Sequence, residues 1–234
     1  MMVAAFLRGA FKAFGAIGAA AALCTSAQAQ NPTSSADFRI NHAADAKVRG
    51  AIELDRLVRC AAARRENLAQ NILRTRPGSD AEDRLAYPFR KVIENCMNDI
   101  VTAISTSNQD LRGAIAEVFF LQRYAAKPDF ARIEHKAVAL PEAWSQGKIS
   151  EYEKIGMLGQ DFANCVVATA PDNADALMRT AIRSTGERAE FRRLVPVLGP
   201  CLPKGLKMEL DVAWLRGVVA EGLLRSMGEW GAKA

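Results

Sequence analysis

Apolar residues recur along the chain at intervals of three and four, the spacing of an amphipathic helix. Clear stripes of this kind lie at Leu85, Phe89, Val92, Ile93 and Cys96, and again at Phe191, Leu194, Leu198 and Cys201. No alternating strand pattern of useful length is present. The pattern therefore predicts an all-α protein, with helices over 45–64, 67–76, 79–97 and 108–124, followed by 150–169, 172–182, 184–200 and 207–228.

Polar residues mark where several of these helices begin and end. Three Ser-x-x-Glu strings have the form of a capping box, at Ser79–Glu82, Ser150–Glu153 and Ser184–Glu187. Asn67 and Asp172 occupy equivalent positions and are predicted to cap the two shorter helices. Three prolines should disturb the longer helices: Pro88 and Pro196 are expected to kink them, and Pro200 to end the second.

The chain repeats itself at an offset of about 105 residues. Cys60 and Cys96 are 36 residues apart, as are Cys165 and Cys201, and the two 37-residue windows share nine identities, including the cysteines. The string LRGAIAE at 111–117 returns as LRGVVAE at 215–221. These matches predict two tandem four-helix units related by internal duplication.

The units divide the rest of the chain into a leader, a loose segment and a linker. Residues 1–29 combine Arg8 and Lys12, a short apolar run and Ala27-Gln28-Ala29, the pattern of a cleaved signal peptide. Residues 30–44 are polar and are expected to be flexible. Unit 1 spans 45–125, a linker that can include a helix over 130–140 spans 126–148, and unit 2 spans 149–234.

Four cysteines remain once the leader with Cys24 is removed: Cys60, Cys96, Cys165 and Cys201. An even count in an exported chain favours disulfides, whereas a metal site would need closer cysteines or clustered histidines. We expect one disulfide in each unit, although four cysteines allow three pairings. An exported, oxidising location, periplasmic or secreted, follows from the leader and the cysteines together.

Each LRGxxAE string places a glycine inside a predicted helix, where it costs about 1 kcal/mol relative to alanine. Gly113 and Gly217 are therefore expected to let another backbone approach closely. The glutamate four residues later, Glu117 or Glu221, would then be partly buried and need a partner.

An arginine repeated in the short helices provides a candidate partner for each glutamate. We expect Arg74 to pair with Glu117, and Arg179 with Glu221, because a guanidinium can hold a carboxylate through two hydrogen bonds. Arg112 and Arg216 compete, but each points about 140° away from the glutamate of its own string. The alternative is that these glutamates have raised pKa values and act as general acids in glycan cleavage.

Other chemistry finds little support in the sequence. The net charge is +5, falling to +3 without Arg8 and Lys12, and the charges are interspersed, which argues against nucleic acid as a partner. Searches for nucleotide, metalloprotease and hydrolase motifs find none, so no cofactor or metal is expected. The two histidines and the three tryptophans are interpreted as structural residues rather than as catalytic or binding residues: His42, His135, Trp144, Trp214 and Trp230. The run Phe119-Phe120-Leu121 can be buried between the units or form a binding patch.

The leader, the cysteine pairs, the Arg-Thr helix end and the later LRGxxAE string together resemble a group of uncharacterised exported proteins from alphaproteobacteria. The resemblance implies the compartment and the repeat, and carries no site residues. We expect a non-enzymatic binding or structural protein of the cell envelope, with a protein, peptide or glycan bound between its two units and no membrane span after leader removal. The alternative is an envelope hydrolase acting on glycan or peptide through Glu117 or Glu221.

Overall fold

The computed structural model describes residues 35–97, 106–131, 133, 137–138, 146–202 and 212–228. The predicted signal peptide lies outside these residues, as do His135, Trp144, Trp230, the side chain of His42 and much of the helix considered for 130–140. All regular secondary structure in the described ranges is helical, which confirms the all-α class. Within those ranges, no helix combines the length and the apolar character needed to cross a bilayer.

The helices follow the predicted order on both sides of the linker. They are α1 (Ser35–Arg64), α2 (Glu66–Arg74), α3 (Asp80–Glu94) and α4 (Asn108–Arg123), then α6 (Glu151–Thr169), α7 (Pro171–Met178), α8 (Thr185–Cys201) and α9 (Val212–Ser226). Helix α1 begins at Ser35, so much of the segment 30–44 that was expected to be loose is helical. Helix α8 continues through Pro200 to Cys201, one residue beyond its predicted end.

The serines predicted to begin helices do so. Ser79, Ser150 and Ser184 each accept a hydrogen bond from the backbone N–H three residues on, which satisfies a donor that the helix itself leaves unpaired. The glutamates of the first and third strings reach one residue further back than a capping box requires: Glu82 accepts from the N–H of Gly78, and Glu187 from that of Arg183. These carboxylates therefore brace the turn that precedes each helix.

The N-caps predicted for the shorter helices are wrong. Asn67 and Asp172 lie inside α2 and α7, which begin one residue earlier and have Arg65 and Ala170 at the N-cap without a side-chain hydrogen bond. Each cap residue instead donates its own N–H to the end of the preceding helix, at 2.9 Å to Ala61 O and Val166 O. The short helices thus follow directly from the long ones, and Pro171 in the first turn of α7 needs no N–H partner.

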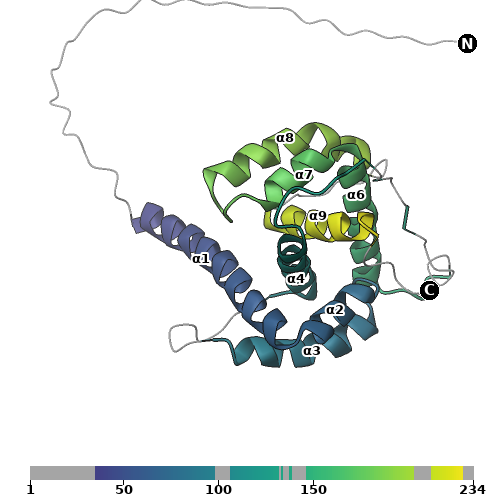
Figure 1. Ribbon diagram of the computed structural model, residues 1–234. Coiled ribbons are helices and arrows are strands. Elements are labelled where there is room, and N and C mark those ends of the chain that lie inside the picture. Colours follow the sequence, from purple (N-terminus) through teal and green to yellow (C-terminus); the bar gives the residue numbers. More distant parts are fainter. Residues whose placement is uncertain are drawn as a thin grey trace, which may run out of the picture.

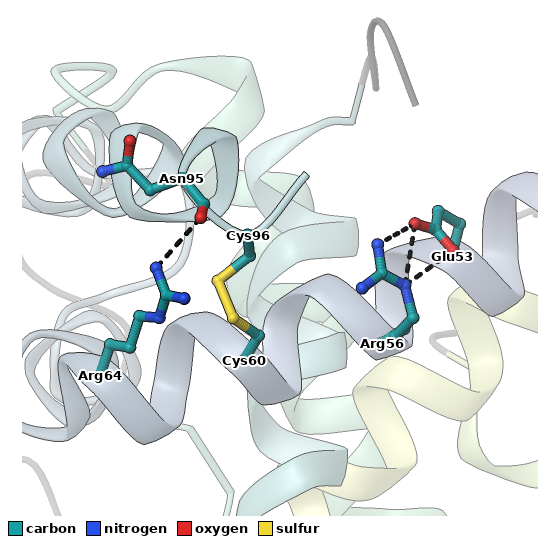
Figure 2. The surroundings of a disulfide bond; sticks show 6 residues. All are labelled: Glu53, Arg56, Cys60, Arg64, Asn95 and Cys96. Carbon is teal, nitrogen blue, oxygen red and sulfur yellow. Dashed lines mark hydrogen bonds and ion pairs between the residues drawn. A yellow bond between two sulfur atoms is a disulfide. The ribbon is translucent and has the colours of Figure 1, made fainter. Parts of the chain in front are cut away.

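Both predicted disulfides are present, Cys60–Cys96 and Cys165–Cys201, with Cα–Cα distances of 6.1 and 5.6 Å. Figure 2 shows the first, which joins α1 to the turn that follows α3, beside a hydrogen bond from Arg64 to the carbonyl of Asn95. Each disulfide links cysteines 36 residues apart in the sequence. It stabilises the folded state by about 4 kcal/mol, because it restricts the conformations of the unfolded chain.

Helices α4 and α9 lie at the centre and cross each other, with the other helices around them (Figure 1). Leu111, Ile115 and Phe120 on α4 and Leu215 and Val219 on α9 are completely buried. Helices α2 and α3 lie on one side of this pair and α7 and α8 on the other, while α1 extends away at its N-terminal end (Figure 1).

The crossing point is formed by the two glycines of the repeated string. A Cβ atom added to Gly113 would lie 2.6 Å from the Cα of Gly217, and one added to Gly217 would lie 2.9 Å from the Cα of Gly113. The close backbone approach expected at each glycine is therefore an approach of the two glycines to each other. It brings the N-terminal ends of both LRGxxAE strings within reach of the glutamates of the opposite string.

Candidate binding site

Two buried arginine–glutamate pairs cross between the strings. Arg112 donates from Nε and Nη2 to the carboxylate of Glu221 at 2.7 and 2.8 Å. Arg216 donates from Nε and Nη2 to Glu117 at 2.8 and 2.6 Å. The four residues are between 2 and 7 % exposed, so both ion pairs are held in a low-dielectric interior.

Each arginine also closes the end of a short helix. Arg112 donates to the carbonyls of Ile72, Leu73 and Thr75 at 2.7 to 3.0 Å, and Arg216 to those of Leu177, Met178 and Thr180 at 2.9 to 3.1 Å. These carbonyls lie at the ends of α2 and α7, where several backbone acceptors have no helical donor. A guanidinium suits that position because it adds positive charge at the negative end of the helix dipole.

A second glutamate completes each cluster from the longer helix. Glu82 accepts from Nη1 of Arg112 at 3.2 Å, and Glu187 from Nη1 of Arg216 at 3.1 Å. These are the capping-string glutamates of α3 and α8, only 1 and 2 % exposed. We name the two groups the first cluster (Glu82, Arg112, Glu221, Arg225) and the second cluster (Glu117, Glu187, Arg216).

The expected pairs Arg74–Glu117 and Arg179–Glu221 are wrong. Arg74 donates to Asn71, and Arg179 forms an ion pair with Asp175 and donates to the carbonyls of Tyr124 and Ala125. The glycine crossing brings Arg112 and Arg216 to the glutamate of the opposite string, Glu221 and Glu117 respectively, rather than to the glutamate of their own.

The two clusters differ in charge. In the first cluster, Arg225 also donates to Glu221, at 2.8 Å, and to the carbonyl of Leu73, at 2.8 Å. The position equivalent to Arg225, 104 residues earlier, is Leu121. The first cluster thus holds two arginines and two glutamates, whereas the second, among the described residues, holds one arginine against two glutamates.

Burial and the neighbouring arginines set the protonation of the first cluster. Burial raises the pKa of Glu221, but Arg112 and Arg225 outweigh burial and lower it to about 2. Burial also raises the pKa of Glu82, and there the attraction of Arg112 does not fully offset it. Glu221 is therefore ionised at neutral pH and cannot supply a proton as a general acid.

The second cluster borders a cavity of about 510 Å³. Its wall comes from α1, the first half of α4, the turn before α8 and the start of α9, and includes Leu54, Asp55, Asp110, Gly113, Glu117, Arg183, Glu187, Trp214 and Arg216. A shallower hollow of about 640 Å³ adjoins it and shares Asp55, Glu117, Ile182 and Arg216. Leu121 and Met178 line this hollow beside Glu117.

The pocket at the corresponding place beside the first cluster is nearly filled and has a volume of only about 20 Å³. Its lining residues Pro77, Gly156, Gln160 and Glu221 correspond to Ile182, Ala51, Asp55 and Glu117 of the open cavity, at offsets of 105 or 104.

Small residues on α6 and α9 account for the closure. A Cβ on Gly156 would lie 2.7 Å from Pro77, and one on Gly222 would lie 3.1 Å from the backbone of Ala163. The residues equivalent to Gly222 and Ala163 are Val118 and Val58, both completely buried, so the corresponding contact of α1 with α4 carries larger side chains.

The remaining residues singled out in the sequence have structural positions. Phe120 is completely buried and Phe119 is 6 % exposed, so these two belong to the core. Trp214 lines the cavity and lies against Phe162, with ring centroids 5.9 Å apart. In the described part of the chain, no three histidine, cysteine or acidic residues come together in a way that would hold a metal ion.

Comparisons with known proteins give no family assignment. No protein-family model, no curated protein and no solved structure matches this chain.

Proposed function

We propose that this chain is an exported, non-enzymatic helical protein of the cell envelope that binds its partner in the cavity between α1, α4 and α9. The observation that carries the proposal is the cavity itself. Its volume, about 510 Å³, lies within the range of roughly 300 to 1,000 Å³ that is usual for binding sites. Trp214 and Leu54 provide apolar contact area, and Asp55, Asp110 and Glu117 provide polar groups.

Export is supported by the leader pattern and by the two disulfides. The leader ends with small residues at 27–29, and disulfides of this kind persist in oxidising compartments. The periplasm or the cell exterior is therefore the proposed location.

An internal duplication explains why the cavity exists. The contacts of Arg112 with residues 72, 73, 75 and 82 recur for Arg216 with residues 177, 178, 180 and 187, always at an offset of 105. We infer that two copies of one helical module pack face to face through their glycines. In one copy the protein's own side chains fill the site, whereas in the other copy the site is open.

The hydrolase alternative has less support. A carboxylate acid and a second carboxylate would have to face one substrate, roughly 5 to 9.5 Å apart. Glu117 and Glu221 are instead each held by two hydrogen bonds from a different arginine, in clusters on opposite sides of the glycine crossing. Each carboxylate is therefore occupied by its own arginine, and the lowered pKa of Glu221 keeps that group ionised at neutral pH.

Paired affinity capture tests the proposal. The wild-type protein and an Ala114→Trp variant, whose indole would occupy the cavity, are immobilised and exposed to an envelope extract. Ala131→Trp, at an exposed position away from the cavity, is the control of equal size. The proposal predicts a component retained by the wild type and the control but lost with Ala114→Trp. Equal retention by all three would refute the cavity as the binding site.

A further inference from the structure

We propose that the hollow beside Glu117 binds a guanidinium group of the ligand, in the place that Arg225 fills in the other half of the protein. This inference rests on the proposed function, since it names the chemistry that the open site recognises. The ligand class is a molecule that carries an arginine side chain.

Arg225 shows how a guanidinium is held at the closed copy of the site. It lies 2.8 Å from the carboxylate of Glu221 and 2.8 Å from the carbonyl of Leu73, and its side chain is only 14 % exposed. Leu73 O accepts from both Arg112 and Arg225. A second guanidinium is thus part of the finished cluster.

The open copy keeps the acceptors and lacks this donor. Glu117 corresponds to Glu221, and Met178, whose carbonyl accepts from Arg216 at 2.9 Å, corresponds to Leu73. Leu121 stands where Arg225 would be, and all three residues line the same hollow. A ligand guanidinium placed there would meet one carboxylate and one helix-end carbonyl, as Arg225 does.

The charges around the hollow favour a cation. Glu117 and Glu187 share Arg216, so among the described residues the second cluster holds two carboxylates and one guanidinium. The arginines at the rim are matched to other acids, Arg59 to Asp55 at 2.8 Å and Arg179 to Asp175 at 2.8 Å. A buried carboxylate without a full charge partner is costly, and a bound guanidinium would remove that cost.

The adjoining cavity can hold the rest of such a ligand. It meets the hollow at Asp55, Glu117 and Arg216, so a side chain bound in the hollow leads directly into it. Trp214 on its wall provides an aromatic face for the attached backbone or neighbouring side chain.

Calorimetric titration of the oxidised protein tests the inference with two arginine sources, free L-arginine and the peptide acetyl-Ala-Arg-Ala-amide. Citrulline and the citrulline peptide have nearly the same shape without the charge and act as matched controls. We expect an arginine probe to bind, and its citrulline counterpart to bind about tenfold more weakly or worse, because the ureido group keeps N–H donors but lacks the positive charge that strengthens their hydrogen bonds to a carboxylate. Tighter binding of the peptide than of free arginine identifies a peptide as the source, and the reverse identifies the free amino acid.

Two variants of the protein complete the test. Leu121→Arg supplies the missing guanidinium from α4 and should abolish binding, whereas Leu121→Gln, a neutral change at the same position, should retain it. Glu117→Gln should weaken binding about tenfold. The inference is overturned if neither arginine probe binds at millimolar concentration, if citrulline binds as well, or if Leu121→Arg binds like the wild type. Even in those cases, the proposed function would stand if the wild-type protein captures a component from the envelope extract and Ala114→Trp does not.

Discussion

Replacing Gly113 by alanine tests the contact at the centre of the fold. The added Cβ would lie 2.6 Å from the Cα and 3.1 Å from the carbonyl carbon of Gly217, both backbone atoms of a buried helix. Neither can move aside as a flexible side chain would, so α4 and α9 must separate. Overpacking of this kind costs about 1 to 3 kcal/mol, and a backbone obstacle places the cost at the upper end of that range.

The helix itself would gain from the same substitution. Alanine is favoured over glycine in a helix by about 1 kcal/mol, so we expect Gly113→Ala to lower the free energy of unfolding by about 2 kcal/mol in total. Gly50→Ala is the matched control, because Gly50 lies in α1 with no atom within 4 Å of an added Cβ. That variant should be about 1 kcal/mol more stable than the wild type.

Urea unfolding of both variants, followed by circular dichroism, measures the difference. The two urea midpoints should move in opposite directions from that of the wild type. If Gly113→Ala proves as stable as Gly50→Ala, the glycines do not bring the two backbones into contact.

Three further predictions concern the disulfide, the buried ion pair of Glu221 and the turns before α3 and α8. Removing the first disulfide by changing Cys60 and Cys96 to serine should cost up to about 4 kcal/mol of stability in urea unfolding, and a loss near zero would contradict the assigned pairing. Glu221 has a folded-state pKa of about 2, below its usual value of 4.5. Above about pH 5 its ionised form should therefore contribute on the order of 3 kcal/mol to the free energy of unfolding, and this contribution is lost as the pH falls toward 2. Glu221→Gln should lack this acid-dependent loss, and an unchanged pH profile would refute the ion pairs. Gly78 and Arg183 lie in the turns before α3 and α8 and have positive φ angles of 73° and 60°. In thermal unfolding, Arg183→Gly should be neutral or stabilising by up to about 1 kcal/mol, because glycine adopts positive φ without strain. Gly78→Ala should be strongly destabilising, because the added Cβ would lie 2.7 Å from the backbone of Glu153.

Local features of the fold are predictable from the sequence because they depend on residues close together in the chain. The helix stripes, the serine caps and the equal cysteine spacings each predict a feature that the structure contains. The N-caps at Asn67 and Asp172 fail for a related reason. Their side chains suit a cap, but the residue before each short helix donates its backbone N–H to the end of the long helix, so the short helix begins one residue earlier.

The candidate site depends on contacts between distant residues, which spacing along the chain does not reveal. The sequence shows that Glu117 and Glu221 need partners, but the partner depends on which helix crosses which. One signal was available: Arg112 and Arg216 are repeated within the same strings as the glycines and the glutamates. A close approach of the two strings at their glycines would have placed each arginine beside the opposite glutamate.

The open cavity and the closed pocket differ at residues that occupy matching positions, 104 or 105 apart in the sequence. Gly156, Gly222 and Arg225 have Ala51, Val118 and Leu121 at the positions 104 or 105 residues earlier. The two glycines make close contacts beside the closed site, and Arg225 adds a cation to it. Each is unremarkable by itself in the sequence. Together they distinguish an open site from a closed one.

The central claim is that each arginine of an LRGxxAE string pairs with the glutamate of the other string, and a double-mutant cycle in urea unfolding tests it most directly. The cycle combines Arg216→Lys with Glu117→Gln, and a second cycle combines Arg74→Lys with Glu117→Gln. The account predicts a coupling free energy of about 1 kcal/mol or more for Arg216 and Glu117, and a value within about 0.5 kcal/mol of zero for Arg74 and Glu117. Strong coupling to Arg74 with none to Arg216 would contradict the crossed pairs.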